Sequence, residues 1–201
     1  AVAQAALPAL QPGDGATVAL DLPFADGKAL RIEAARADGT ALPALGAWHR
    51  AAGGVRGRAP AEGEHYVPLG GAMAFIGLAD PPPMARPGSA AWLRPRFLAL
   101  RPLALDASVS VGLARPDLGW EHKVDGTPAL GAIPTLKWVR GWLVEDAHAL
   151  SLPTEAPSGP AEITVAVYDA FTLAPLHVLD ERLAREGQGI QFRAGTLEVA
   201  P

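Results

Sequence analysis

The chain has 201 residues, which is enough for one large domain or two small ones. Apolar residues make up 49% of it, charged residues only 19%, and the formal net charge is −4. This balance allows a sizeable core and excludes the clustered basic surface that nucleic-acid binding requires. The absence of cysteine excludes disulfides and thiol chemistry.

No stretch approaches the roughly 20 apolar residues of a transmembrane helix, so we expect no transmembrane segment in this chain. The chain starts at Ala1 rather than Met, and we therefore expect a processed protein or an excised piece of a longer one. Its 22 glycines and 20 prolines punctuate short apolar runs. That punctuation is typical of proteins with many short strands.

Residues 1–68 predict a small β-rich arm or subdomain that precedes the main domain. Short strands are expected at residues 17–22 and 29–37, and Asp38-Gly39 is a hairpin turn signal. Residues 46–63 read as a loop because glycine and arginine dominate them. The loop is expected to be solvated, and an anion-binding loop is the alternative.

Residues 69–201 predict the main domain. The apolar run at residues 72–79 indicates a buried strand, and residues 92–100 indicate another in which Pro95 marks a strand start or a sheet edge. Residues 108–113 alternate apolar and small polar side chains, which is the pattern of a half-buried antiparallel strand. Residues 163–168 repeat this alternation, and two short strands follow around Gly195.

Residues 136–152 fit two patterns. Leu136, Val139 and Leu143 would form part of a helical stripe, whereas alternate residues from Trp142 onward would form one face of a strand. Gly141 and the nearby tryptophans favour the strand. A single helical turn is expected near residues 180–185.

Together these segments give about eight to ten short strands separated by turn residues. The predicted fold is therefore all-β, an antiparallel β-sandwich of jelly-roll or immunoglobulin-like type over residues 69–201, with a smaller β-rich segment over residues 1–68.

The second half of the chain carries an ordered series of residues: Gly131, Pro134-Thr135, Trp138, Gly141, Val144, Asp146, Leu150, Leu152-Pro153, Pro157, Gly159, Val167-Tyr168-Asp169, Thr172, Leu176 and Leu179-Asp180. In this series residues 72–201 resemble the C-terminal extracytoplasmic β-sandwich domain of bacterial lipid-carrier-dependent, mannosyltransferase-like membrane glycosyltransferases and their uncharacterised relatives. Ala161, Ala166 and Pro175 depart from that pattern. The resemblance implies a periplasmic or cell-surface location and association with a membrane through a parent chain or a partner.

Catalytic motifs are absent from the sequence. It contains no Gly-x-Ser-x-Gly elbow, no phosphate-binding loop and no pair of histidines spaced for a zincin. Glu145 and Asp146 are neighbours on a predicted strand, so they point to opposite faces and do not form the carboxylate pair of a glycosidase. We therefore expect a chain without catalytic machinery.

Carboxylates at predicted strand ends offer one candidate for a cofactor. Asp146, Asp169 and Asp180 could supply oxygen ligands to calcium. The alternative is that these residues are solvated or bond backbone groups in turns. A zinc site assembled from distant histidines is a further alternative.

Two aromatic clusters are candidates for carbohydrate contact. Trp120, Glu121 and His122 lie in a stretch that reads as a loop, and Trp48 has similar neighbours. An exposed indole could stack on a pyranose ring, and the alternative is that each tryptophan closes one end of the core.

These features predict a non-catalytic extracytoplasmic accessory or binding module that recognises carbohydrate, attached to a membrane glycosyltransferase-like protein. The alternative is a structural or assembly subunit of a bacterial surface or membrane complex, whose partners would be other protein chains.

Overall fold

The computed structural model describes residues 30–32, 46–50, 66–131, 134–179 and 189–201. The strand predicted at residues 17–22, the turn at Asp38-Gly39 and the helical turn at residues 180–185 lie outside these ranges. Within them the chain forms strands and three short 3-10 turns, which confirms the all-β prediction. The described residues include no helix that is long and apolar enough to cross a membrane.

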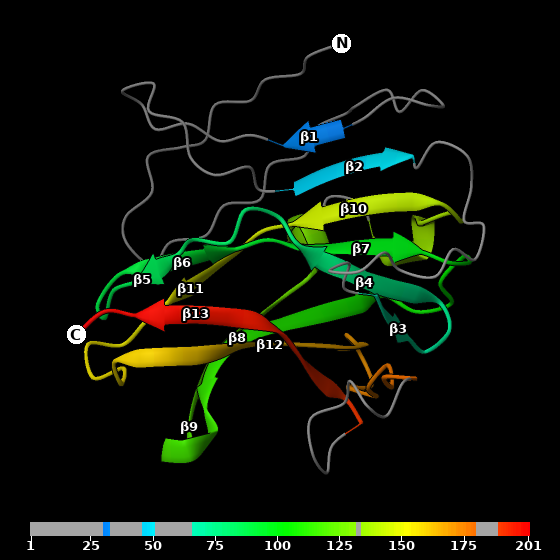
Figure 1. Ribbon diagram of the computed structural model, residues 1–201. Coiled ribbons are helices and arrows are strands. Elements are labelled where there is room, and N and C mark those ends of the chain that lie inside the picture. Colours follow the sequence, from blue (N-terminus) through cyan, green and yellow to red (C-terminus); the bar gives the residue numbers. More distant parts are fainter. Residues whose placement is uncertain (1–29, 33–45, 51–65, 132–133, 180–188) are drawn as a thin grey trace.

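One layer of the sandwich is a six-stranded sheet in the order β1-β2-β10-β7-β4-β3. Its strands are β1 (Leu30–Ile32), β2 (Gly46–Arg50), β3 (Val67–Leu69), β4 (Met73–Leu78), β7 (Pro95–Ala99) and β10 (Trp142–Asp146). Strand β6 (Ala90–Leu93) directly precedes β7 in the chain, and β11 (His148–Ser151) directly follows β10. Strands β6 and β11 pair with each other, so the pair prolongs this layer (Figure 1).

The other layer is a five-stranded sheet in the order β5-β13-β12-β8-β9. Its strands are β5 (Met84–Ala85), β8 (Ala107–Arg115), β9 (Trp120–Gly126), β12 (Gly159–Asp169) and β13 (Gln191–Val199). The 3-10 turns are η1 (Pro116–Leu118), η2 (Pro128–Gly131) and η3 (Thr135–Lys137). Only the short pairing of β5 with β13 is parallel among the described strand pairs.

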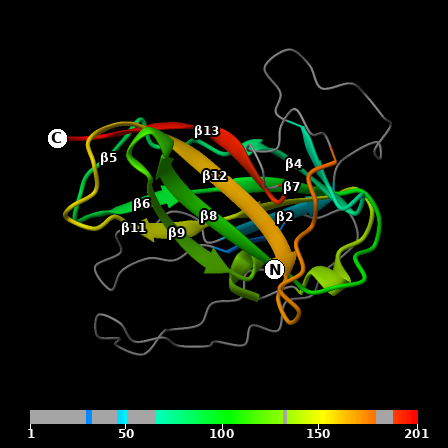
Figure 2. The same cartoon turned by 90° about the horizontal axis from the view of Figure 1, so that it is seen from below.

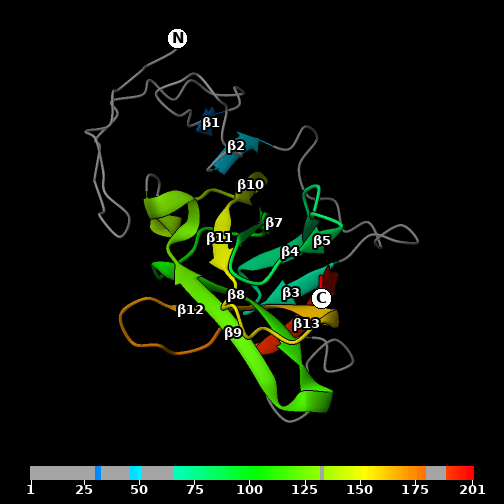
Figure 3. The same ribbon diagram turned by 90° about the vertical axis from the view of Figure 1, so that its left-hand side faces the viewer.

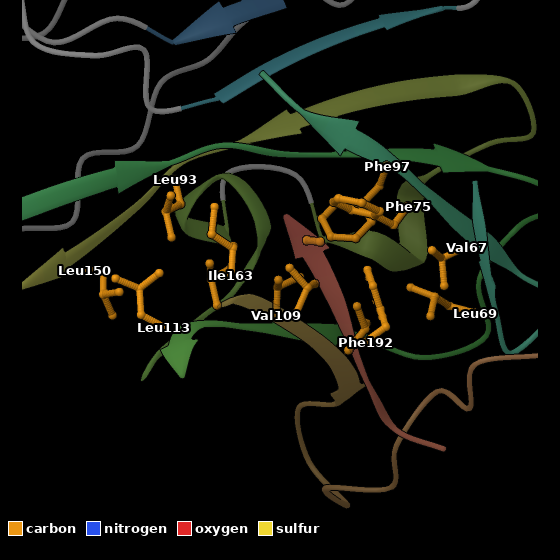
Figure 4. Close-up of a cluster of buried hydrophobic side chains, with 14 of the residues drawn as sticks. Val67, Leu69, Phe75, Leu93, Phe97, Val109, Leu113, Leu150, Ile163 and Phe192 are labelled. Carbon is orange, nitrogen blue, oxygen red and sulfur yellow. The ribbon is translucent and has the colours of Figure 1, made fainter. Parts of the chain in front are cut away.

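The core lies between the two layers. Phe192 of β13 approaches Phe75 of β4 with ring centroids 5.0 Å apart, and Phe75 meets Phe97 of β7 at 6.1 Å in an edge-to-face arrangement (Figure 4). All three rings are fully buried. Such aromatic pairs contribute about 0.5–1.5 kcal/mol each beyond the area they bury, so this cluster helps to hold the two sheets together.

The alternation predicted for residues 108–113 is confirmed in β8, but both faces of the strand are buried, whereas the sequence predicted a half-buried one. Val109, Val111 and Leu113 enter the core. Ser108 and Ser110 point the other way and are nevertheless only 8% and 9% exposed. Because β8 is flanked by β12 and β9, side chains of both neighbours cover its outward face.

The loop predicted at residues 46–63 is wrong at its start, where Gly46–Arg50 forms β2. This strand pairs along its whole length with β10. The local sequence does not show this pairing, because it joins segments about a hundred residues apart. Strands β1 and β2 of the predicted N-terminal segment thereby extend a sheet of the main domain.

The strand interpretation of residues 136–152 is confirmed from Trp142 onward. Val144, Asp146, His148 and Leu150 are all buried, as alternation on one face predicts. Ala147 separates β10 from β11.

Candidate functional site

The predicted carbohydrate contacts Trp120, Glu121 and His122 begin strand β9, whereas the sequence predicted a loop there. The hairpin of β8 and β9 closes through η1, and Gly119 after it has a φ of 61°, which glycine adopts without strain. Side chains along β9 alternate between a partly buried and an exposed face. The three contacts are therefore adjacent in the chain but do not share one face.

Trp120 and His122 point to the inner side of β9. Trp120 packs against the hydrophobic core, and the two rings lie nearly parallel with centroids 6.4 Å apart. The His122 Nε2–H donates to the Ser151 carbonyl oxygen at 2.7 Å, which ties β9 to β11 of the opposite layer (Figure 3). This geometry fits the interpretation in which Trp120 closes the core.

Glu121 points to the outer face and is exposed. Its Oε1 accepts a hydrogen bond of 2.7 Å from Nε2 of Gln191, the first residue of β13. In the sheet, β8 and β12 lie between β9 and β13. The bond therefore links the two strands that border the centre of the outer face.

The centre of this outer face carries only small side chains on β8 and β12. They are Ser110, Gly112, Ala114, Thr164 and Ala166. A Cβ atom on Gly112 would lie 2.8 Å from the His122 carbonyl oxygen, so only glycine lets β9 approach β8 this closely. Long polar side chains from the bordering strands can lean over such short neighbours, and the centre is nearly buried as a result.

Thr164 lies at this centre with 1% of its surface exposed, and its Oγ1 has no hydrogen-bond partner among the described residues. A buried polar atom without a partner costs about 1–3 kcal/mol. Thr164 thus leaves an unsatisfied hydroxyl under the outer face, covered by the side chains around it.

Charges of both signs surround the centre. Glu121 and Asp125 on β9 are acidic, and Lys123 between them is basic. On the other border, Nη1 of Arg193 in β13 lies 3.7 Å from Oε1 of Glu162 in β12. Because these charges nearly cancel, the face suits a neutral polar ligand better than a highly charged one.

Trp48, the remaining predicted carbohydrate contact, lies in β2 of the other sheet. Its backbone pairs with Val144 on one side and Leu30 on the other. Trp48 and the β9 residues therefore belong to different layers.

Of the three predicted calcium ligands, Asp146 is buried. Its Oδ2 lies 2.7 Å from His148 Nε2, and its Oδ1 accepts the Ala147 N–H at 2.8 Å. Both carboxylate oxygens thus have protein partners in the bend between β10 and β11.

Asp169 ends β12, and its Oδ1 accepts the backbone N–H groups of Phe171 and Thr172 at 2.8 and 2.9 Å. These bonds, that from Thr172 above all, hold the pKa of the Asp169 carboxyl below its usual range. Asp180, the third predicted ligand, lies outside the described residues. Within the described part of the chain, no three His, Cys, Asp or Glu side chains gather as metal ligands would.

Sequence reasoning missed Gln191, Thr164 and Gly112. The alternation around Phe192 could have placed Gln191 on an outward face. Its bond to Glu121 spans 70 positions of sequence and depends on the order of four strands, which no local pattern shows. No family model matches this sequence, and no curated protein matches it.

Proposed function

We propose that this chain is a non-catalytic, extracytoplasmic binding module that recognises carbohydrate and serves as an accessory to a membrane glycosyltransferase-like protein. The observation that carries the proposal is the Glu121–Gln191 pair on the outer face of the five-stranded sheet. The residue series that resembles the glycosyltransferase C-terminal domains supports the extracytoplasmic placement.

A carboxylate beside an amide is well suited to neighbouring sugar hydroxyls. Glu121 can accept hydrogen bonds from two hydroxyl groups, and the Gln191 amide can donate to one oxygen and accept from another. Sugar hydroxyls both donate and accept, so a glycan can replace the bond that these side chains make to each other.

The nearly balanced charge of the face agrees with an uncharged glycan. The predicted stacking role of Trp120 stays a prediction, and it would use the part of the indole that the core leaves exposed. In this site Glu121 and Gln191 make the direct contacts, while His122 fixes β9 to β11 from the other side.

A glycan array with the full chain, followed by calorimetry on the best ligand, tests the proposal. Glu121→Gln should weaken binding about tenfold or more, because hydrogen bonds to a charged group contribute about 1.5–3 kcal/mol. Gln191→Ala removes neutral hydrogen bonds of about 0.5–1.5 kcal/mol each and should weaken binding about two- to tenfold. Glu155→Gln changes an exposed glutamate outside this sheet and serves as the control, with no change expected.

Absence of binding to any glycan would contradict the proposal, as would equal weakening by the control. Co-purification with other protein chains, without glycan binding, would favour an assembly subunit instead.

A further inference from the structure

Large apolar side chains are exposed at one end of the sandwich. Phe171 is 82% exposed and Leu173 69%. The loops at this end expose three others: Leu136, Val139 and Leu179. Exposed apolar groups that gather in one region usually mark an interaction surface.

Asp106 brings two of these loops together. Its Oδ1 accepts the Thr135 N–H at 3.1 Å, and its backbone oxygen accepts the Ala170 N–H at 2.8 Å. Leu136 and Phe171 each follow one of these bonded residues in the chain. Figure 2 shows the segment after β12, in orange, at the same end of the sandwich as the 3-10 turn η3.

The loop that exposes Phe171 and Leu173 is held by several hydrogen bonds. Asp169 Oδ1 accepts the Phe171 and Thr172 N–H groups, and the Asp169 backbone exchanges bonds with Leu173 and Ala174. The two apolar side chains are thus presented on a defined turn.

Leu173 adopts a φ of 59°, in the left-handed region that a leucine rarely occupies. Glycine or asparagine would suit this position better. Burial does not explain the leucine, because its side chain is mostly exposed. An exposed apolar side chain kept at a strained position points to a role outside the fold.

Basic groups lie beside the apolar ones. Lys137 and Arg140 are exposed next to Leu136 and Val139, and Arg101 lies at the same end. In the described loops of this end the acidic residues are Asp106 and the turn residue Asp169, and both carboxylates accept backbone N–H groups. These bonds do not remove the two negative charges, but three basic side chains against two acidic ones leave the described loops with a net charge of +1.

We propose that this end of the sandwich docks on an anionic lipid bilayer. Phe171 and Leu173 enter the boundary between headgroups and acyl chains, and Lys137 and Arg140 face the lipid phosphates. Apolar insertion combined with basic side chains is what reversible attachment to an anionic membrane surface requires.

The docking surface is separate from the proposed glycan face. Ala107 of β8 lies at the apolar end, and Ala114 lies beside Glu121. Seven strand residues separate these positions, or about 23 Å. A docked chain would therefore keep Glu121 away from the bilayer. Gln191 pairs with Ala166, three strand residues or about 10 Å from Asp169, and its side chain reaches toward Glu121. The lipid proposal does not depend on the glycan proposal.

Co-sedimentation of the full chain with phosphatidylcholine vesicles, with and without phosphatidylglycerol, tests this surface. Phe171→Ser and Leu173→Gly should each lower the partition coefficient on anionic vesicles about tenfold, because each removes a large apolar group from the bilayer. Leu173→Gly also removes the backbone strain, so its Tm should stay or rise while binding falls. A residue with only a structural role would not show this opposition.

Leu118→Ser and Met84→Ser remove exposed apolar side chains away from these loops and should leave partition unchanged. Lys137→Gln should weaken binding on anionic vesicles only, and added salt should reduce the difference from the parent chain. The proposal is overturned if the chain binds neither vesicle, if the controls lose binding equally, or if Phe171→Ser abolishes a complex with a protein while vesicle binding is unaffected.

Discussion

His148 Nε2 lies 2.7 Å from Asp146 Oδ2, and the two side chains are only 5% and 2% exposed. They stand on either side of Ala147, whose N–H bonds the other oxygen of Asp146. The pair therefore holds the bend at which β10 gives way to β11.

His148→Ala should lower the free energy of unfolding by about 3 kcal/mol, because it removes the imidazole partner of a buried carboxylate. Urea unfolding followed by tryptophan fluorescence measures this. Asp117→Ala, which breaks the exposed ion pair with Arg115, should leave the stability nearly unchanged. Equal effects of the two variants would show that the buried pair does not hold the bend.

Stability should depend on the ionisation of Asp169. Backbone N–H groups of Thr172 and Phe171 favour the carboxylate and lower its pKa in the folded chain. Its stabilising effect is therefore complete above the ordinary pKa of about 3.9 and is lost as the pH falls through the lower folded pKa.

Asp169→Ala should accordingly destabilise the chain at neutral pH, and the difference from the parent chain should shrink below about pH 4. Asp169→Asn keeps an acceptor oxygen, so its loss of stability at neutral pH should be smaller than that of Asp169→Ala. The carboxyl group at position 169 is absent, so the free energy of unfolding of this variant should not change with its ionisation. Urea unfolding at several pH values measures both, and a difference that grows toward acid would contradict the assignment.

Thr135 is fully buried, and its hydroxyl joins three groups. Oγ1 accepts the Ala107 N–H at 2.7 Å and lies 2.9 Å from the Leu105 carbonyl oxygen and 3.1 Å from Asp106 Oδ1. Thr135→Val should cost about 1–3 kcal/mol, since a buried N–H loses its acceptor.

The matched variant Thr135→Ser keeps the hydroxyl and loses one methyl group, so about 0.8 kcal/mol is expected. Thermal unfolding distinguishes the two. If serine were as damaging as valine, packing of the methyl group rather than the hydroxyl would be the cause.

Gly112→Ala should separate β9 from β8. The new Cβ atom would lie 2.8 Å from the His122 carbonyl oxygen and 2.9 Å from Lys123 Cβ, closer than real contacts allow. We expect a loss of about 1–3 kcal/mol together with weaker glycan binding.

Gly195→Ala is the control, because its Cβ atom would meet neighbours only at the ordinary distances of 3.6 and 3.7 Å. Urea unfolding measures the loss of stability in both variants, and calorimetry measures their glycan binding. A tolerated Gly112→Ala would mean that β9 can move away from β8 without cost.

Strands with a regular alternation could be predicted from the sequence. Val109, Val111 and Leu113 identify β8 because apolar side chains on alternate residues need a shared interior. Pro95 was expected at a strand start or a sheet edge and begins β7, as a residue without a backbone N–H can.

Features that depend on distant partners could not be predicted. Gly46–Arg50 looks like a loop by composition and becomes a strand because β10 offers it a ladder of backbone hydrogen bonds. For the same reason β9 looked like a loop until β8 and β11 held it. In the candidate site, Glu121 was found from its sequence neighbours, whereas Gln191 becomes its partner only after four strands are in order.

The ladder between β2 and β10 also bears on how the chain can be divided. Five consecutive residue pairs, from Trp142 opposite Arg50 to Asp146 opposite Gly46, join the first quarter of the chain to its second half. A truncated version beginning near residue 66 would leave a row of backbone donors and acceptors on β10 open to solvent. Such an unprotected border readily recruits another copy of the same chain, so the shortened protein would tend to aggregate.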